Sequence, residues 1–270
     1  MLRTDKGDAR YSHPKQPWIT IIISALNAAK TLEKCILSIT GQKYYFKELI
    51  VMDGGSTDNS INLLHSYNRM ISYWESEADK GIYHAWNKAL NHAHGEWICF
   101  VGADDYFYNS QTLEHMVPHL NRAVASGTKL VYGQVVQVNE AGQPVRVLGK
   151  PWGKISWQIR YGMPLHFPHP GMMHHRNLFR EHGRFDQTFK IAGDYEFLLR
   201  ELKNKKKKAL YTGFKTMGSQ IGGLSDANRL STLKEARKAR IKNELSGSSW
   251  FWMAVYMRAI IRNFLNQHRP

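Results

Sequence analysis

The sequence predicts an α/β protein whose central sheet is parallel in the first half of the chain and mixed overall. Between residues 18 and 101, short apolar runs alternate with segments in which apolar residues recur at helical spacing, and this alternation is typical of βαβ units. After residue 130, two apolar runs flank a turn at 139–142, as in an antiparallel pair. The 270 residues, 43% of them hydrophobic, suffice for a full core in one large domain or two small ones.

The first half of the chain is expected to contain four strands. The run ITIIIS at 19–24 is apolar throughout, which is expected of a strand that helices cover on both faces. Thr31 stands where it can cap the following helix, and Gly41 stands where it can end it. The other strands are expected at 48–52, 71–76 and 96–101, and further helices over 59–68 and after Tyr83.

The second half is expected to be less regular. A loop rich in Pro, His and Met at 163–175 precedes a helix over 194–202. The run KNKKKK at 203–208 indicates a solvated basic stretch, and a Gly-rich segment follows at 218–225. The tail is expected to be helical over 229–245 and again over 250–265.

The chain is strongly basic, with 37 Lys and Arg against 22 Asp and Glu, a formal charge of +15. This excess predicts attraction to polyanions such as nucleic acid, phosphorylated ligands or an anionic membrane surface. Cys35 and Cys99 lie in apolar segments, so we expect buried free thiols in a reducing compartment. Residues 1–17 lack the apolar run of a signal peptide and are expected to form a flexible leader. A cytoplasmic protein is therefore predicted.

Acidic residues follow three of the predicted strands. Asp53 ends the second strand, Asp79 follows the third, and Asp104 and Asp105 follow the fourth. Two adjacent aspartates, taken alone, would most simply cap a helix or form a turn. However, open α/β sheets bind ligands at the carboxyl ends of their strands, so these acids are expected to converge on one edge. Carboxylates together with substrate phosphates are the usual ligands of Mg²⁺ or Mn²⁺.

The loop DGGSTD at 53–58 fits neither the GxGxxG pattern nor the P-loop. Four segments in order, ITIIISALNAAKTLEKCILSI, ELIVMDGGSTDNS, ESEADKGIYHAWNKAL and GEWICFVGADD, instead resemble the Rossmann-like nucleotide-sugar domain of family 2 glycosyltransferases with the GT-A fold. The resemblance is strongest to bacterial enzymes that build capsule, exopolysaccharide or O-antigen chains. It covers residues 18–225 and implies a nucleotide-sugar half at 18–105, an acceptor half at 106–225 and a basic, amphipathic helical extension at 226–270.

The resemblance implies a nucleotide-sugar site at the strand ends. The residues that end the first strand would line the nucleobase pocket, Asp53 would hydrogen-bond the base or ribose, and Lys80 would bring positive charge to the diphosphate. Asn87 is the weakest member, because packing of its helix in the core explains it more simply. The full set is Ala25, Leu26, Asn27, Asp53, Asp79, Lys80, Gly81, Asn87 and Ala103.

A metal site is implied beside it. The segment GADD occupies the place of the family's DxD motif, whose acids hold the metal that bridges the two phosphates. Gly102 stands where the first acid is expected. The resemblance therefore implies a divalent ion, Mn²⁺ or Mg²⁺, on Asp104, with Asp105 as its partner.

A catalytic base is implied in the second half. The segment FDQTFKIAGDYEFLLREL at 185–202 resembles the family segment whose acid deprotonates the acceptor in inverting enzymes, and Asp194 holds that place. Independently, a carboxylate at a helix start can face a cleft and accept a proton from a sugar hydroxyl. The structural alternative is a helix cap. Glu196, two residues on, is expected to be structural.

The remaining assignments concern histidines and glycines. Four histidines at 166, 169, 174 and 175 match no common zinc spacing. By the resemblance, the segment HPGMMHHR lies near the acceptor and the diphosphate, and His169 is the expected contact there. Gly222 and Gly223 resemble part of a loop that closes over the donor, although a plain turn explains them equally well.

The sequence thus predicts an inverting hexosyl- or N-acetylhexosaminyltransferase. Its donor is expected to be UDP-linked, and its acceptor a hydroxyl of a glycan or lipid-linked saccharide in bacterial surface polysaccharide synthesis. A metal-dependent nucleotide-sugar hydrolase and a basic nucleic-acid-binding protein stay open as alternatives, although no nucleic-acid motif is present. Residues 246–270 fit a helix on an anionic membrane surface, and equally a helix that docks on the protein or on another copy.

Overall fold

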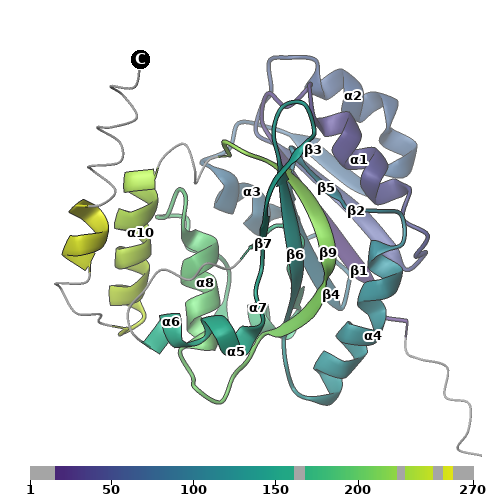
Figure 1. Ribbon diagram of the computed structural model, residues 1–270. Helices are drawn as coiled ribbons and strands as arrows, with labels where there is room; N and C mark the ends of the chain where they lie inside the picture. The colour runs from purple at the N-terminus through teal and green to yellow at the C-terminus, as the bar shows by residue number, and fades with distance from the viewer. Residues whose placement is uncertain (1–15, 161–167, 224–228, 246–251, 258–270) are drawn as a thin grey trace, which may run out of the picture.

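A computed structural model describes residues 16–160, 168–223, 229–245 and 252–257 (Figure 1). The first half contains β1 (Ile19–Ala25), α1 (Leu32–Thr40), β2 (Lys47–Asp53), α2 (Ser60–Ser66), β3 (Tyr73–Ser76), α3 (Ile82–Ala89) and β4 (Trp97–Gly102). The second half contains β5 (Asp105–Phe107), α4 (Thr112–Ala125), β6 (Leu130–Val138), β7 (Pro144–Leu148), α5 (Trp152–Ile155), α6 (Trp157–Arg160), β8 (Met173–His175), α7 (Asn177–His182), α8 (Gly193–Leu202), β9 (Leu210–Gln220) and α10 (Arg229–Lys242).

All the described strands belong to one sheet, and the predicted mixed α/β class is confirmed. The strand order is β3-β2-β1-β4-β8-β6-β9-β5, with β7 paired to the far part of β6. Strands β1 to β4 pair in parallel, whereas β8 runs antiparallel to both β4 and β6. The carboxyl ends of β1, β2, β3, β4 and β6 therefore lie along one edge.

Helices cover both faces of the sheet (Figure 1). The first cluster packs α1, α2 and α4 on one face, and the second packs α3, α7, α8 and α10 on the other. Strand β1 contributes alternately, with Ile21 and Ile23 in the first cluster and Ile22 in the second. All three side chains are fully buried, and each such burial stabilises the fold by about 1.5–3 kcal/mol. This two-sided burial explains why the strand is apolar throughout.

Several details differ from the sequence-based expectation. Strands β5, β8 and β9 and helix α4 were not predicted, and β8 lies inside the segment expected to be a Pro-, His- and Met-rich loop. Helix α2 ends at Ser66, and a 3-10 turn at Asn68–Met70 follows it. Thr31 makes no side-chain cap bond, because its hydroxyl donates back to the Ala28 carbonyl at 3.4 Å. Thr31 does occupy the N-cap position of α1, as predicted, but without a side-chain bond to the first turn.

The C-terminal region supplies two helical pieces among the described residues. Helix α10 packs against α8, and residues 252–257 form a further helical turn in which Trp252 is buried. No helix within the described ranges is long and apolar enough to cross a bilayer. Residues 1–15, and most of the segment assigned to a membrane surface, lie outside the described residues. Cys35 and Cys99 are buried and free, as predicted.

Candidate active site

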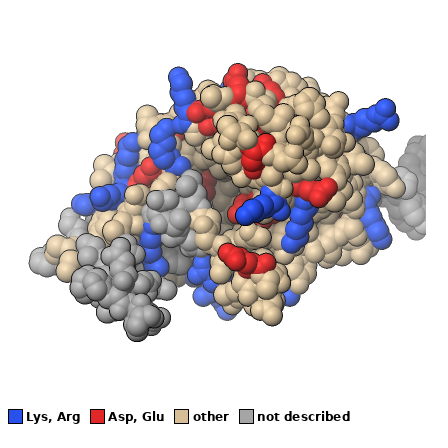
Figure 2. Space-filling view, turned by 90° about the horizontal axis from the view of Figure 1, so that it is seen from above, with Lys and Arg blue, Asp and Glu red and all other residues tan. Residues whose placement is uncertain are grey.

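The carboxyl ends of the parallel strands border a cavity of about 370 Å³. Figure 2 looks down onto this edge and shows a hollow near the centre of the face, with acidic side chains at its rim. Side chains from both halves of the chain line the cavity. Among them are Asp104, Asp105, His169, Asp194 and Gly223. Four of the sequence-assigned regions thus meet in one space.

The loop after β2 is organised around Asp53. The side chain is 1% exposed, and its Oδ2 accepts hydrogen bonds from the amides of Gly55 (3.1 Å) and Ser56 (2.8 Å) and from the Ser76 hydroxyl (2.7 Å). The Ser56 hydroxyl donates to the other oxygen. Asp53 therefore shapes the loop from within, a role that the sequence did not predict. Its assignment to the base or ribose stays a prediction.

The residues after β1 face this loop. Asn27 adopts a positive φ of 49°, and its side-chain oxygen accepts a hydrogen bond from the Thr57 amide at 2.8 Å. Leu26 is 60% exposed at the end of the strand, whereas Ala25 is buried and its carbonyl accepts the Gly54 amide at 2.8 Å. The side chain that ends β1 and projects outward is thus apolar and open, which suits contact with a flat base.

The segment at 79–81 lies next to the same edge. A Cβ atom added to Gly54 would lie 2.9 Å from Asp79 Oδ2, so the loops after β2 and β3 touch at this point. Asp79 Oδ1 accepts the Gly81 amide at 2.7 Å, and the exposed Lys80 has its carbonyl bonded by Lys190 Nζ at 2.7 Å. A second lysine that the sequence did not single out therefore stands beside the predicted diphosphate contact.

Asn87 is turned toward the protein interior. Its side-chain amide donates to the Phe185 carbonyl at 2.8 Å, and its side-chain oxygen accepts the Phe185 amide at 3.0 Å. The residue is buried and is absent from the cavity lining. These bonds fit a structural role for Asn87, which was the simpler explanation from the sequence.

Asp104 and Asp105 stand side by side after β4 at the cavity. Burial raises the pKa of both carboxyls, and the charge of Asp104 raises that of Asp105 further. Asp105 Oδ2 accepts the Gly102 amide at 3.0 Å, and the Ser219 side chain also donates to Asp105. Two carboxylates that repel each other in a partly closed space are chemically suited to a hard divalent cation, which would remove the repulsion. Asp104 and Asp105 thus fit such an ion. Ala103, between Gly102 and Asp104, is buried.

Gly102 has a packing reason to lack a side chain. A Cβ atom at this position would lie 2.7 Å from Asp104 Oδ1 and 3.1 Å from Asp105 Oδ2. A side chain at this position would therefore make the Asp104 carboxylate shift and would crowd the Asp105 carboxylate. A glycine in place of the first acid of the DxD pattern therefore fits beside the two carboxylates.

Asp194 lies in the first turn of α8, after the cap position at Ala192, so it does not cap the helix. Its side chain is 25% exposed and lines the cavity. Oδ1 accepts the Tyr195 amide at 2.8 Å and the Tyr83 hydroxyl at 3.2 Å. Burial raises the pKa of Asp194 to about 6. The result is a carboxylate that is held at one oxygen, ionised at neutral pH and more basic than an exposed aspartate.

His169 stands next to Asp194, with 4.0 Å between its Nδ1 and Asp194 Oδ2. The ring is buried and stacks on Trp86, with 5.2 Å between ring centroids. Burial lowers the pKa of His169 to about 3, so the imidazole is neutral. His174 is fully buried and its Nδ1 lies 3.3 Å from the Ile98 carbonyl, whereas His166 lies outside the described residues.

Sequence reasoning missed several residues at the cavity. Tyr83 and Trp86 on α3 line it, although the sequence indicated core packing for this helix and singled out only Asn87 on it as a site candidate. Gln137 on β6 and Arg146 on β7 also line it, and the Arg146 guanidinium donates to the Gln137 side chain. Nothing in the local sequence marks these two residues, because strand pairing with distant parts of the chain brings the hairpin to the cavity. Of the predicted loop glycines, Gly223 lines the cavity and Gly222 adopts a φ of +92°.

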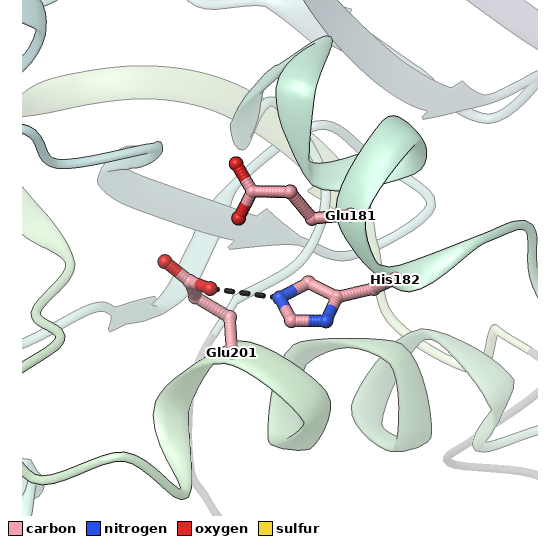
Figure 3. Close-up of side chains that lie close together, drawn as sticks. All are labelled: Glu181, His182 and Glu201. Carbon is pink, nitrogen blue, oxygen red and sulfur yellow. Dashed lines mark hydrogen bonds and ion pairs between the residues drawn. The ribbon is translucent and has the colours of Figure 1, made fainter.

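A second acidic group lies elsewhere. Figure 3 shows Glu181 and His182 of α7 turned toward Glu201 of α8, and their ligand atoms lie within 4.8 Å of one another. His182 Nε2 lies 2.8 Å from Glu201 Oε2. Lys129 Nζ already pairs with Glu181 and lies 3.7 Å from Glu201 Oε1. Because a lysine supplies the positive charge there, this group is weaker as a metal site than Asp104 and Asp105.

Sequence comparison identifies related proteins. The profile described as Glycosyl transferase family 2 matches residues 20–183, and the match ends before Asp194. The chain is 29% identical over 216 residues to the PGL/p-HBAD biosynthesis glycosyltransferase of Mycobacterium tuberculosis, covering 78% of this chain and 80% of the relative. It is 30% identical over 189 residues to an uncharacterized glycosyltransferase of the same species, covering 68% of each chain.

Solved structures resemble the fold. Residues 1–349 of S. aureus TarS in complex with UDP-GlcNAc match with a TM-score of 0.64 and 18% identity, over 86% of this chain and 67% of that one. The mannosyltransferase of Pyrobaculum calidifontis in complex with GDP-Man and Mn²⁺ matches with a TM-score of 0.62 and 17% identity, over 91% and 69%. The predicted GT-A fold is thereby confirmed. The chain spans about two-thirds of these solved chains.

Proposed function

The chain belongs to glycosyltransferase family 2, and from this premise we propose that it transfers one sugar from a nucleoside diphosphate donor to an acceptor hydroxyl with inversion. The observation that supports this proposal is the shared cavity. Asp104 and Asp105 from the first half and Asp194 from the second half line the same 370 Å³ space. A donor diphosphate at the first pair and an acceptor hydroxyl at Asp194 would bring the anomeric carbon between them.

Asp194 would act as the general base. The acceptor O–H proton passes to Asp194, the acceptor oxygen forms a bond to the anomeric carbon, and the bond from that carbon to the diphosphate oxygen breaks. The nucleoside diphosphate leaves with the electron pair, and a single displacement inverts the anomeric configuration. Asp194 suits this role because its Oδ1 is already held, while Oδ2 accepts no bond from another described residue. Its raised pKa makes it a stronger base than an exposed aspartate at the same pH.

The donor site follows the strand ends. We propose that the base lies against Leu26 and Asn27 near the Asp53 loop, and that Lys80, with Lys190 beside it, faces the diphosphate. UDP is the proposed nucleotide, and a hexosyl or N-acetylhexosaminyl group the proposed sugar, because TarS was solved with UDP-GlcNAc. A divalent cation at Asp104 and Asp105, when bound, would offset the negative charge of the leaving diphosphate. The P. calidifontis mannosyltransferase, solved with GDP-Man and Mn²⁺, makes GDP the alternative to test.

The acceptor is proposed to be a hydroxyl of a glycan or lipid-linked saccharide in bacterial surface polysaccharide synthesis. The M. tuberculosis relative is named as a glycosyltransferase of PGL/p-HBAD biosynthesis, which supports a biosynthetic role for this chain. We further propose a cytoplasmic protein that residues 246–270 bring to an anionic membrane. Liposome flotation of the full chain and of a chain that ends at residue 245 tests this part, and equal binding by the two would contradict it.

The donor proposal is tested by thermal denaturation with UDP, UDP-GlcNAc or GDP-mannose, each with and without Mn²⁺. A ligand that binds the folded state raises the melting temperature. We expect the largest rise with a UDP ligand plus Mn²⁺, and loss of the Mn²⁺-dependent part in Asp104→Ala. Glu181→Gln, which alters the second acidic group, is the matched control and should keep it. An equal rise with GDP-mannose would contradict the choice of UDP.

The base proposal is tested by Asp194→Asn. This variant should bind the donor as the wild type does but lose about 10²- to 10⁴-fold in the transfer rate, the usual contribution of a general base. Glycan products are measured with a panel of saccharide acceptors, and release of free sugar in their absence reports hydrolysis. Full transfer activity of Asp194→Asn would overturn the assignment. Free sugar as the main product even with acceptors would favour the hydrolase alternative.

A further inference from the structure

The chain segment that leads into Asp194 is held by a residue of the C-terminal helix. Glu235 on α10 accepts hydrogen bonds from three consecutive backbone amides: Lys190 at 2.9 Å, and Ile191 and Ala192 at 2.8 Å each. Asp194 follows two residues after the last of them. The carboxylate that organises this turn therefore comes from more than 40 residues further along the chain.

These bonds hold the turn that leads into α8 and end at its N-cap residue, Ala192. The first turn of a helix leaves backbone amides without partners, and usually a nearby side chain accepts them. The cap position of α8 is Ala192, which has no side-chain acceptor. Glu235 accepts the amide of this cap residue and the two amides before it, and bonds from amides to a charged carboxylate are about twice as strong as neutral ones. Its negative charge at the start of α8 also suits the helix dipole.

Other side chains of α10 contact the same stretch. Lys242 Nζ pairs with Asp186 at 2.7 Å and with the buried Glu196 at 3.1 Å. Arg240, itself 1% exposed, lies with its Nη1 3.3 Å from the Tyr195 hydroxyl. Contacts to α10 thus occur on both sides of Asp194 in the sequence, and the helix fixes the whole segment rather than one point of it.

The opposite side of the segment is fixed by α3. The single proton of the Tyr83 hydroxyl is shared between two acceptors, the Ile191 carbonyl at 2.7 Å and Asp194 Oδ1 at 3.2 Å. A Cβ atom at Gly193 would lie 2.8–2.9 Å from the Tyr83 ring, so the backbone is packed directly on that ring. Residues 190–194 are therefore held by contacts with α3 on one side and with α10 on the other. If the α10 side were released, the Asp194 carboxylate would lose its fixed distance to the cavity.

We infer that Glu235 is a positioning residue for Asp194, and that α10 therefore orients the carboxylate of the active site. The inference rests on the proposed role of Asp194 as base. A misplacement of about 1 Å at a reacting group can cost about 10²-fold in rate. The groups that face Asp194 are Tyr83 from α3, His169 from the loop before β8 and Glu235 from α10. Tyr83 and Glu235 both hold the backbone that carries the carboxylate, and Glu235 does so at three consecutive amides.

The test compares Glu235→Ala and Glu235→Gln with Lys234→Ala, a matched control that alters the exposed neighbour on the same helix. The first measurement is release of UDP from UDP-GlcNAc, or of GDP from GDP-mannose if that donor stabilises the protein more, with Mn²⁺ and saccharide acceptors. We expect Glu235→Ala to lower kcat by about 10- to 100-fold with the donor KM within twofold. Lys234→Ala should match the wild type in both.

The second measurement needs no turnover. The chain is labelled with ¹³C at aspartate carboxyls, and the Asp194 signal is assigned by its absence in Asp194→Asn. The negative charge of Glu235 raises the pKa of Asp194, so Glu235→Gln should lower that pKa, whereas Lys234→Ala should not. The glutamine keeps most of the side-chain volume, so this arm applies even if the alanine variant does not fold.

The outcomes separate the two proposals. If Asp194→Asn is fully active, the proposed base is wrong whatever Glu235 does. If Asp194→Asn is inactive but Glu235→Ala keeps its kcat, and Glu235→Gln leaves the Asp194 pKa unchanged, the inference about α10 alone is overturned. A lower kcat with an unchanged donor KM, together with a lowered Asp194 pKa, supports it.

Discussion

The two sides of the cavity are built in different ways. On the donor side, the Asp53 carboxylate is held by partners two to 23 residues away, and Asn27 is bonded to Thr57 of the adjoining loop. On the acceptor side, Asp194 is bonded to Tyr83, 111 residues away, and its backbone is held by Glu235 of the C-terminal helix. The donor loops are thus shaped mainly by their own strand ends, while the proposed base depends on two distant helices.

This difference predicts different consequences of mutation. The donor loops are held by hydrogen bonds among their own residues. A substitution that removes such a bond should therefore mainly lower the free energy of unfolding. A change at Asp194 should relieve a buried charge, so its effect on stability should have the opposite sign. The three predictions below test this contrast, beginning with the largest expected effect on stability.

Asp53→Ala should destabilise the protein by about 2–4 kcal/mol, because it leaves the amides of the buried Ser56 and the half-buried Gly55 without their charged acceptor. The free energy of unfolding is measured by urea denaturation at pH 7. Asp53→Asn, which keeps the shape and one acceptor oxygen, serves as the control and should lose less. A loss below 1 kcal/mol in the alanine variant would break the claim that this residue organises the donor loops.

Asp194→Asn should stabilise the protein at pH 7 by up to about 3 kcal/mol. Burial raises the pKa of Asp194 from about 4 to about 6, so the folded state holds the proton more tightly than the unfolded state. Below pH 4 the carboxyl is therefore neutral and does not lower the free energy of unfolding. As the pH rises from 4 to 6, its ionisation progressively lowers that free energy. A tenfold change in proton affinity corresponds to about 1.4 kcal/mol, and the remaining exposure of the side chain makes this value an upper limit.

Urea denaturation at pH 4 and at pH 7 checks this prediction, and the measurement at pH 4 is its internal control. The wild type and Asp194→Asn should differ little at pH 4 and most at pH 7. A variant that is less stable than the wild type at pH 7 would show that the carboxylate serves the fold, as Asp53 does, and the contrast between the two sides would fail.

Tyr83→Phe should give the smallest effect, a shift in the pH dependence of the transfer rate. It tests whether a distant helix tunes Asp194. The Tyr83 hydroxyl lowers the pKa of Asp194 by donating to its carboxylate, so its removal should raise that pKa. The acid limb of the rate profile should move to higher pH, by less than one pH unit. The profile of transfer rate against pH measures this shift, with Tyr108→Phe on the surface as the control. A shift to lower pH would contradict the assigned hydrogen bond.

Much of the donor side could be predicted from the sequence. The apolar run of β1, the periodic helices and the acids at 53, 79, 104 and 105 all follow from local patterns, because parallel strands bring their ends to one edge. The family resemblance added the roles. The internal bonds of Asp53 were not predicted, since a carboxylate after a strand fits a ligand contact and a loop anchor equally well.

The acceptor side was predicted only in part. Asp194 and His169 were found through the resemblance, and they lie 4.0 Å apart at the cavity. Tyr83 and Glu235 were missed, because on their own helices they look like a core aromatic and a surface acid. Strands β8 and β9 were missed for a related reason. Their short or polar sequences become strands only through pairing with β4 and β6, which are far away in the chain.

By itself, then, the sequence determined the parallel core, the positions of the acids at strand ends and the fold class, because these depend on hydrophobic periodicity over a few residues. Which helices hold Asp194, and where the second half closes the cavity, can be seen only in the folded molecule. The reason is the separation along the chain of the residues that interact. Burial patterns repeat along the chain, whereas a hydrogen bond or a steric contact between residues 40 to 110 positions apart exists only once the sheet has brought them together.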